Sequence, residues 1–471
     1  MNLLILGFVS AAIVIALASL NWRVSVKTAL VLLIFEGVLR KWVLPQGSVL
    51  IYFLKDFVLL GAYLGYFFLF RDKIQITKKN YTIITLSFMA AIWCIFQAFN
   101  PSLGSPIIGM FGLKNYLIYL PLMWMMPDLF PTIEEFYKFL RVYLLLIIPV
   151  GLLAILQFFS PTDSVLNVYA NEEHQVAVFG FGGETLAARV TGPFSYIAGY
   201  STYLGVSLCL LLPMMTFPQP KWWRMLTTIE LMLVAVTSFM TGARGLIATC
   251  ILILLGYFLI QAATQFEDFL HTFQKLTIPA ILAFITITIG FSSAVQAFWN
   301  RVTSNQDISS RLTGAVAESF SFFSLKGIDG YGTGATFQAN PIIRSLFGLP
   351  PGEYIPVYYE GELGRIALEL GPVGFFLWYG FKLVILVALG LVYLRLQRTF
   401  LRQLALSAFL FQAISFSNQL VFNHTAGLYH WFLNGFVFLL PHLEQIANWQ
   451  QYQQQINYTT WQYTEAEEQK S

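Results

Sequence analysis

Apolar runs of about 20 residues recur along most of the chain, and short charged stretches separate them. A helix of that length crosses the hydrocarbon core of a bilayer. Hydrophobic residues make up 57% of the chain and charged residues 11%, whereas an average soluble protein is roughly 25% charged. A soluble fold this apolar would lack the polar surface to cover itself. The sequence therefore predicts an all-α, polytopic transmembrane helical bundle.

The apolar runs predict about 12–13 membrane spans and four regions along the chain. These regions are transmembrane helices over 1–298 with an extracytoplasmic loop near 160–194, a long extracytoplasmic loop carrying short helices over 299–365, further transmembrane helices over 366–442, and a polar cytoplasmic tail over 443–471. The net charge of +3 is small and scattered, which argues against nucleic acid as a partner. The lipid bilayer is the expected surrounding.

Short basic loops predict which segments share a face of the membrane. Cytoplasmic loops are enriched in Lys and Arg. The basic residues that mark three such loops are Arg71, Lys73, Lys78, Lys79, Lys221, Arg224, Arg395, Arg398 and Arg402. With the predicted spans, the polar segments 160–194 and 299–365 and the turn at 241–244 all fall on the opposite, extracytoplasmic face.

Arginines on that face run against the usual charge bias. Arg189 and Arg244 lie in short connections, and Arg301, Arg311 and Arg365 lie in the long loop. Arginine grips phosphate oxygens with a planar fork and keeps its proton, so the pattern indicates an anion-binding site. The alternative is that each arginine reaches lipid headgroups or pairs with a carboxylate of the first loop.

Carboxylates stand beside an arginine where the long loop enters the next predicted span. Glu360 and Glu362 precede Arg365, and Glu369 follows it. The spacings of three and four residues from Arg365 predict an ion-paired helix start. The alternative is a general base at the membrane surface, held beside cationic groups. A glycine-rich stretch around Tyr331 is interpreted as a turn that lets the long loop fold back on the membrane.

Several other charged or metal-binding residue types favour structural roles. Glu36 and Arg40 lie at helical spacing inside the second predicted span, which suits a buried pair. Lys55, Asp56, Lys114 and Glu230 also lie near or inside spans and are expected to be structural or interfacial. His424 and His430 are six residues apart, the wrong helical spacing for a shared metal. The three cysteines have no paired spacing, which argues against a disulfide framework or a cysteine zinc site. No metal site and no cofactor are predicted.

Four segments carry a family resemblance. They are Arg-Val-Thr-Gly-Pro-Phe-Ser-Tyr at 189–196, Thr-Gly-Ala-Arg-Gly at 241–245, Arg311 ahead of Gly-Tyr-Gly-Thr-Gly at 330–334, and Ile-Ala-Leu-Glu-Leu-Gly-Pro-Val-Gly at 366–374. In this order and spacing they resemble the O-antigen ligase/polymerase superfamily. The resemblance covers residues 189–380 best.

The resemblance implies a metal-independent, inverting glycosyltransferase in the bacterial inner membrane, with its active site on the extracytoplasmic face. The donor would be an oligosaccharide on a polyprenyl (undecaprenyl) diphosphate, and the acceptor a hydroxyl of a second glycan. Arg189 and Arg244 match arginines that hold the diphosphate, and Arg311 matches a third basic position. Flippases and chain-length regulators of polysaccharide assembly would be partners.

One departure from the superfamily bears on the activity. Its ligases carry a histidine, in a His-Asn pattern, about eleven residues before the equivalent of Gly371, where this chain has Glu360-Gly361. This favours a polymerase of O-antigen or exopolysaccharide. The predicted catalytic residues are Glu360, Glu362, Arg189 and Arg244, and the predicted substrate-binding residues are Arg301, Arg311, Arg365 and Tyr331. A ligase with a lipid or protein acceptor remains open, as does a secondary transporter of a lipid-linked or anionic substrate.

Overall fold

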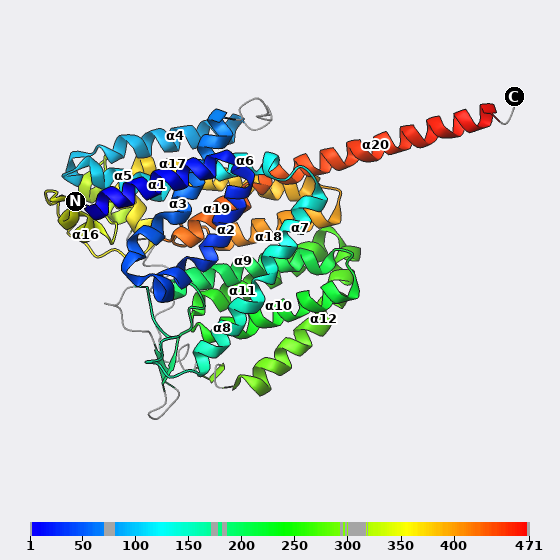
Figure 1. The fold of residues 1–471 in the computed structure, drawn as a ribbon, viewed down its shortest axis with the longest axis horizontal. Helices are drawn as coiled ribbons and strands as arrows, with labels where there is room; N and C mark the ends of the chain where they lie inside the picture. The colour runs from blue at the N-terminus through cyan, green and yellow to red at the C-terminus, as the bar shows by residue number, and fades with distance from the viewer. Residues whose placement is uncertain are drawn as a thin grey trace.

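The α-helices of the protein pack side by side into one bundle (Figure 1). The computed structural model describes residues 2–69, 81–170, 178–180, 186–292, 295–296, 299, 317 and 319–468. Apolar side chains fill the bundle interior, and others, such as Phe68, Phe88 and Leu259, are exposed on its outside. Lipid tails are as apolar as leucine, so apolar residues both inside the bundle and on its outer surface suit a bundle surrounded by lipid. The predicted all-α, polytopic helical bundle is confirmed.

The described residues of the first half of the chain form eight α-helices. They are α1 (Asn2–Leu20), α2 (Trp22–Val38), α3 (Ser48–Leu64), α4 (Tyr81–Ala98), α5 (Pro106–Leu117), α6 (Leu120–Leu129), α7 (Ile133–Leu145) and α8 (Ile147–Phe159). Short π or 3-10 turns extend or join them at η1 (Leu39–Val43), η2 (Pro45–Gly47), η3 (Gly65–Leu69) and η6 (Pro101–Leu103).

The second half adds the remaining helices and one small hairpin. Its helices are α9 (Ile197–Thr216), α10 (Lys221–Met240), α11 (Arg244–Thr264), α12 (Phe266–Ile285) with η7 (Thr286–Gly290), α15 (Phe323–Lys326), α16 (Asn340–Phe347), α17 (Glu362–Arg395), α18 (Thr399–Ile414), α19 (His424–Asn434) and α20 (Phe436–Glu468). The strands β1 (Val178–Gly180) and β2 (Leu186–Ala188) pair antiparallel just before Arg189.

Nine helical segments among the described residues are long and apolar enough to cross a membrane, and Gly7–Leu20 and Thr399–Ile414 are shorter apolar helices. The sequence predicts about 12–13 spans, and the described residues hold these nine candidates and two shorter apolar helices. The α2 helix is not among the nine, because Arg23, Lys27 and Glu36 interrupt its apolar run. The chain is a multi-pass membrane protein.

The polar segment after Leu443 continues the last helix. The α20 helix extends to Glu468 and projects from the bundle (Figure 1). Its many Gln and Glu residues are good helix formers, which explains how a polar segment keeps helical structure. The sequence had predicted a polar tail here without a helix.

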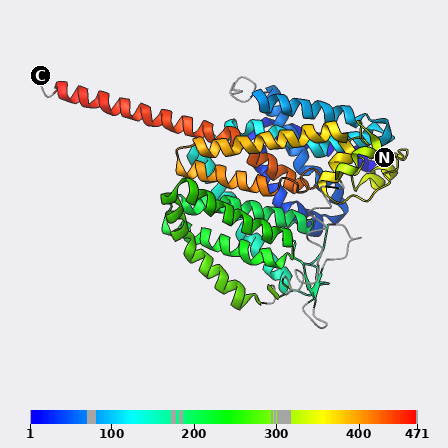
Figure 2. The same cartoon turned by 180° about the vertical axis from the view of Figure 1, so that it is seen from behind.

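The two ends of the bundle hold different segments (Figures 1 and 2). We call the end where α20 leaves the tail end; there Arg402 pairs with Asp268, and the carboxylate of Glu444 accepts the backbone N–H of Gln397. We call the opposite end the loop end. It holds segments 160–170, 186–196, 241–243, 319–361 and 415–423. Their common end agrees with the sequence analysis, and the membrane face that it occupies stays a prediction.

The α17 helix bends sharply at Gly371, which has φ +64° and ψ −177°. We call 362–370 its short arm and 372–395 its long arm. Glu362 and Lys382 are twenty residues apart, about 30 Å along a straight helix. Their side chains nevertheless lie 3.8 Å apart, from Glu362 Oε1 to Lys382 Nζ. The short arm therefore folds back beside the long arm, where the sequence had predicted one continuous span from residue 366.

Tyr116 of α5 supports this geometry because it contacts both arms. Its hydroxyl donates to Glu369 Oε2 over 2.9 Å, and its ring lies 5.1 Å from the ring of Trp378. A proline follows Gly371, and proline is tolerated in the first turn of a helix, here the long arm.

The glycine-rich segment of the long loop packs into the bend. The backbone N–H of Tyr331 donates to Leu368 O over 2.7 Å, and that of Gly332 donates to Glu369 O over 3.0 Å. A Cβ at Gly330 would lie 2.6 Å from the nitrogen of Gly371. The segment lies so close to the bend that the backbones leave no room for a side chain there. The loop therefore folds back onto the bend of α17, and its predicted position on the membrane stays a prediction.

We expect Gly371→Ala to destabilise the protein. Residue 371 has a positive φ, and a Cβ would lie 2.2 Å from the carbonyl oxygen of Ile328. A strained backbone position of this kind costs about 1–3 kcal/mol, so the thermal unfolding midpoint in detergent should fall. Gly380→Ala is the matched control on the long arm, because nothing lies within 4 Å of its Cβ. Equal midpoints for the two variants would contradict the bend.

Candidate functional site

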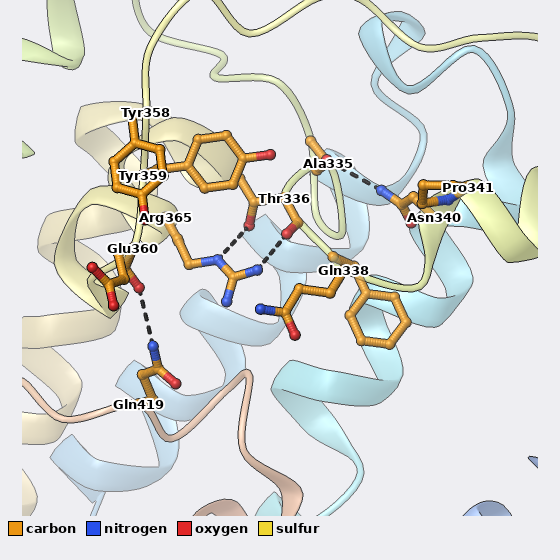
Figure 3. A pocket seen from close by; sticks show the side chains of 11 residues that line it. Ala335, Thr336, Gln338, Asn340, Pro341, Tyr358, Tyr359, Glu360, Arg365 and Gln419 are labelled. Carbon is orange, nitrogen blue, oxygen red and sulfur yellow. Dashed lines mark hydrogen bonds between the residues drawn. The ribbon is translucent and has the colours of Figure 1, made fainter. Parts of the chain in front are cut away.

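A pocket of about 590 Å³ opens at the loop end of the bundle (Figure 3). It lies between the start of α17, the segment around the start of α16 and the turn after α18. Its lining residues are Ala335, Thr336, Phe337, Gln338, Asn340, Pro341, Tyr358, Tyr359, Glu360, Arg365 and Gln419. Two of the residues that the sequence selected, Glu360 and Arg365, are therefore in the same pocket.

Arg365 is fixed in the pocket wall by the loop. Its Nε donates to Thr336 Oγ1 over 3.2 Å, and its Nη2 donates to the Thr336 carbonyl oxygen. The guanidinium also lies over the ring of Phe422, 3.8 Å from the centroid. Figure 3 shows the third nitrogen directed away from Thr336, toward the side of the pocket where Gln419 lies. Two hydrogen bonds and a cation–π contact thus hold Arg365 in the pocket wall.

Glu360 precedes the short arm and is exposed. Its backbone carbonyl accepts a hydrogen bond from Gln419 Nε2 over 3.0 Å, which ties it to the turn after α18. Glu360 and Arg365 line the same pocket, and Figure 3 shows the Glu360 carboxylate directed away from the Arg365 guanidinium. A carboxylate exposed to a pocket can take a proton from a bound hydroxyl. Its role as the base stays a prediction.

Glu362 lies in a different environment and is only 1% exposed. Its Oε2 accepts the backbone N–H groups of Leu420 and Val421, and its Oε1 faces Lys382. The predicted ion pair between Glu362 and Arg365 is wrong. The bend of α17 places Lys382 beside Glu362, and the Arg365 guanidinium is hydrogen-bonded to Thr336 instead. Glu362 does not line the pocket, so the geometry assigns it to holding the short arm in place.

Thr336 links Arg365 to Glu369. Glu369 Oε1 accepts the Thr336 backbone N–H over 2.9 Å and the Thr336 hydroxyl over 2.7 Å. The predicted ion pair between Arg365 and Glu369 is therefore replaced by a hydroxyl bridge. The sequence analysis missed Thr336, Tyr116 and Gln419. No linear pattern marks them, since they come from the long loop, α5 and the turn after α18.

The loop end also brings the segments of Arg189 and Arg244 together. Arg189 Nε donates to Thr241 O over 2.9 Å, and the N–H of Val190 donates to Met240 O over 3.2 Å. The turn at 241–243 leads directly into Arg244, the first residue of α11. Both arginines are half-buried. Two residues 55 positions apart thus lie on adjacent segments, although neither lines the pocket.

Three other predicted residues remain, and the structure describes one of them, Tyr331. Arg301 and Arg311 lie outside the described residues. Tyr331 is 4% exposed, lies under the ammonium group of Lys326 and does not line the pocket. Its position is that of a packing residue at the bend, rather than the substrate-binding residue that the sequence predicted.

Arg40 and Lys41 hold the segment that carries Arg189. Arg40 Nη1 donates to Ser195 Oγ over 3.0 Å. Lys41 Nζ donates to Thr191 Oγ1 over 2.8 Å and to Gly192 O over 3.1 Å. Basic residues at the end of the second span were the only sequence signal of this contact.

Neither a protein-family model nor a curated protein sequence matches the chain. The superfamily assignment stays a prediction from the motifs.

We expect Thr336→Val to weaken the loop's attachment to α17. The change keeps the side-chain shape but leaves Arg365 Nε and Glu369 Oε1 without the hydroxyl. Loss of one such buried hydrogen-bond partner costs about 1–3 kcal/mol, which thermal unfolding in detergent measures. Thr336→Ser should lose less, because it keeps the hydroxyl. Thr202→Val is the control, since the Thr202 hydroxyl donates to Ala198 O of its own helix. Equal losses of stability in the Thr202→Val and Thr336→Val variants would contradict the hydroxyl bridge between Arg365 and Glu369.

Proposed function

We propose that this protein is a membrane glycosyltransferase of the polymerase type. It would transfer a glycan from a polyprenyl-diphosphate carrier to a hydroxyl of an acceptor glycan, on the extracytoplasmic face of the bacterial inner membrane. One observation carries the proposal: Glu360 and Arg365 line a single pocket at the loop end of a membrane-spanning bundle. The motif resemblance supplies the substrate class.

The proposed chemistry is an in-line displacement at the anomeric carbon. The acceptor oxygen forms a bond to this carbon while the bond from the carbon to the diphosphate oxygen breaks on the opposite face. The hydroxyl proton passes to Glu360, and the electron pair of the broken bond leaves with the diphosphate. Arg189 and Arg244 would stabilise the negative charge that grows on the leaving oxygen. Arg365 would orient a sugar or a phosphate oxygen.

A continuous line of contacts supports placing the arginine pair and the pocket in one site. Arg40 contacts Ser195, near Arg189, and pairs with Glu36 over 3.1 Å. Glu36 Oε2 lies 3.3 Å from His424 Nε2. His424 comes two residues after Phe422, on which Arg365 rests.

Lipid-linked intermediates in a deletion strain test the proposed function. A polymerase leaves single repeat units on the carrier lipid, and these should accumulate. Long carrier-linked chains that stay unattached would indicate the ligase alternative instead. Unchanged intermediates and unchanged polysaccharide would contradict glycan transfer of either kind.

Glu360→Gln should abolish polymer formation while the donor lipid still binds. The amide keeps the size of the side chain and cannot accept the proton; loss of general base catalysis typically costs about 10²–10⁴-fold in rate. Polymer length and donor binding are measured on purified variants that have the wild-type unfolding midpoint. Glu353→Gln is the control in the same loop: the hydrogen bond from Lys326 lowers the pKa of the Glu353 carboxyl, and the residue lies outside the pocket. Wild-type turnover by Glu360→Gln would place the base elsewhere.

A further inference from the structure

A second group of charged side chains surrounds one aromatic ring, that of Tyr52 in α3. Three cations approach this ring: Arg40 at 5.2 Å from the centroid, Lys55 at 4.8 Å and Lys114 at 4.5 Å. The imidazole of His424 meets the same ring edge-on at 4.8 Å. We call these residues, with Glu36 and Asp56, the Tyr52 cluster. They come from α2, η1, α3, α5 and α19, and none of them lines the pocket.

The positive charges of the Tyr52 cluster outnumber its carboxylates. Glu36 pairs with Arg40 over 3.1 Å and with Lys55 over 2.7 Å. Asp56 pairs with Lys114 over 2.8 Å and accepts the Tyr119 hydroxyl over 2.7 Å. Three cations thus share two carboxylates. Lys41, next in the chain to Arg40, is also buried and bonds only to neutral groups of residues 191–192.

This excess of positive charge lies inside the bundle. Lys55 and Asp56 are each 1% exposed. A buried charge without a counter-charge is costly in a medium of low dielectric constant, so the cluster favours an additional anion. The side chains of Lys114 and His424 are 15% and 20% exposed, which gives an anion a way in.

The donor groups of the cluster define the ligand chemistry. A guanidinium and ammonium groups donate to phosphate oxygens, and charge-assisted bonds of this kind are among the strong hydrogen bonds in proteins. We propose that the Tyr52 cluster is a second anion-binding site that takes a phosphate or diphosphate group. It consists of other side chains than Arg189 and Arg244, and Arg40 joins it to the segment after Arg189 through Ser195. The proposal does not depend on glycan transfer, because its test measures binding alone.

Pyrophosphate binding to the full-length protein in phosphatidylcholine nanodiscs tests the site. Lys114→Gln removes one cation and should weaken binding about tenfold or more, as expected for a lost charge-assisted hydrogen bond. Asp56→Asn removes one carboxylate, keeps an acceptor for Tyr119 and should tighten binding several-fold. A purely structural ion-pair network would lower the unfolding midpoint in both variants without these opposite changes. Lys114→Arg should retain binding.

Two controls separate this site from other sources of binding. Lys275→Gln removes a lysine of α12 that bonds Thr216 O far from the cluster, and it should leave the affinity unchanged. The responses to Lys114→Gln and Asp56→Asn should persist in an Arg244→Gln background. If phosphatidylglycerol in the nanodisc competes with pyrophosphate in the wild type, a lipid headgroup fills the site; if it does not, a diphosphate from another source does. Wild-type affinity in both Lys114→Gln and Asp56→Asn overturns the proposal.

Discussion

The contact between Glu362 and Lys382 is the constraint on which the loop end depends. It closes the bend of α17, so that a helix which begins inside the bundle runs to Gly371 and then turns back. Because the short arm lies inside, its three charged residues reach partners outside that arm. Glu362 reaches Lys382, Arg365 reaches Thr336 and Phe422, and Glu369 reaches Thr336 and Tyr116. Of these residues, Arg365 and Thr336 also line the pocket.

Glycines make this arrangement sterically accessible. Gly371 supplies the positive φ of the bend, and Gly330 lets the long loop approach it at backbone distance. The loop then places Thr336 between two charged side chains of opposite sign. The Thr336 hydroxyl can accept a hydrogen bond from Arg365 while it donates one to Glu369. A direct ion pair between Arg365 and Glu369 could not replace this bridge unless the loop moved. The loop, the bend and the pocket are therefore parts of one structure.

The helices could be predicted from the sequence because apolar runs of about 20 residues have few alternatives in a membrane protein. The buried pair of Glu36 and Arg40 was also correct, since their partnership is local to one helix. Glu230, expected to be structural, pairs with Arg141 over 2.8 Å. Partnerships within the short arm were predicted by the same helical spacing and were wrong, because a bend and a loop supplied closer partners.

The bend itself left little trace in the hydropathy pattern. Residues on both sides of Gly371 are apolar, and Gly-Pro within an apolar run is compatible with a kinked single span. The Tyr52 cluster was missed for a related reason. Each of its charges, taken alone, is typical of a residue near a span end, and only packing of four helices and η1 brings them around one ring. The geometry of the site depends on long-range contacts between different helices, whereas the helices themselves follow from the local spacing of apolar residues.

The distance between two spin labels, one directly before the short arm of α17 and one on its long arm, tests the fold-back most directly. Gly361 and Gly380 suit labelling, because nothing lies within 4 Å of a Cβ at either position. The free cysteines Cys94, Cys209 and Cys250 are first replaced by serine. A straight helix separates the two positions by about 29 Å. The account predicts a separation of about 20 Å or less, given a helix rise of 1.5 Å per residue and arms that return side by side. A distance near that of the straight helix would contradict the bend and the pocket built on it.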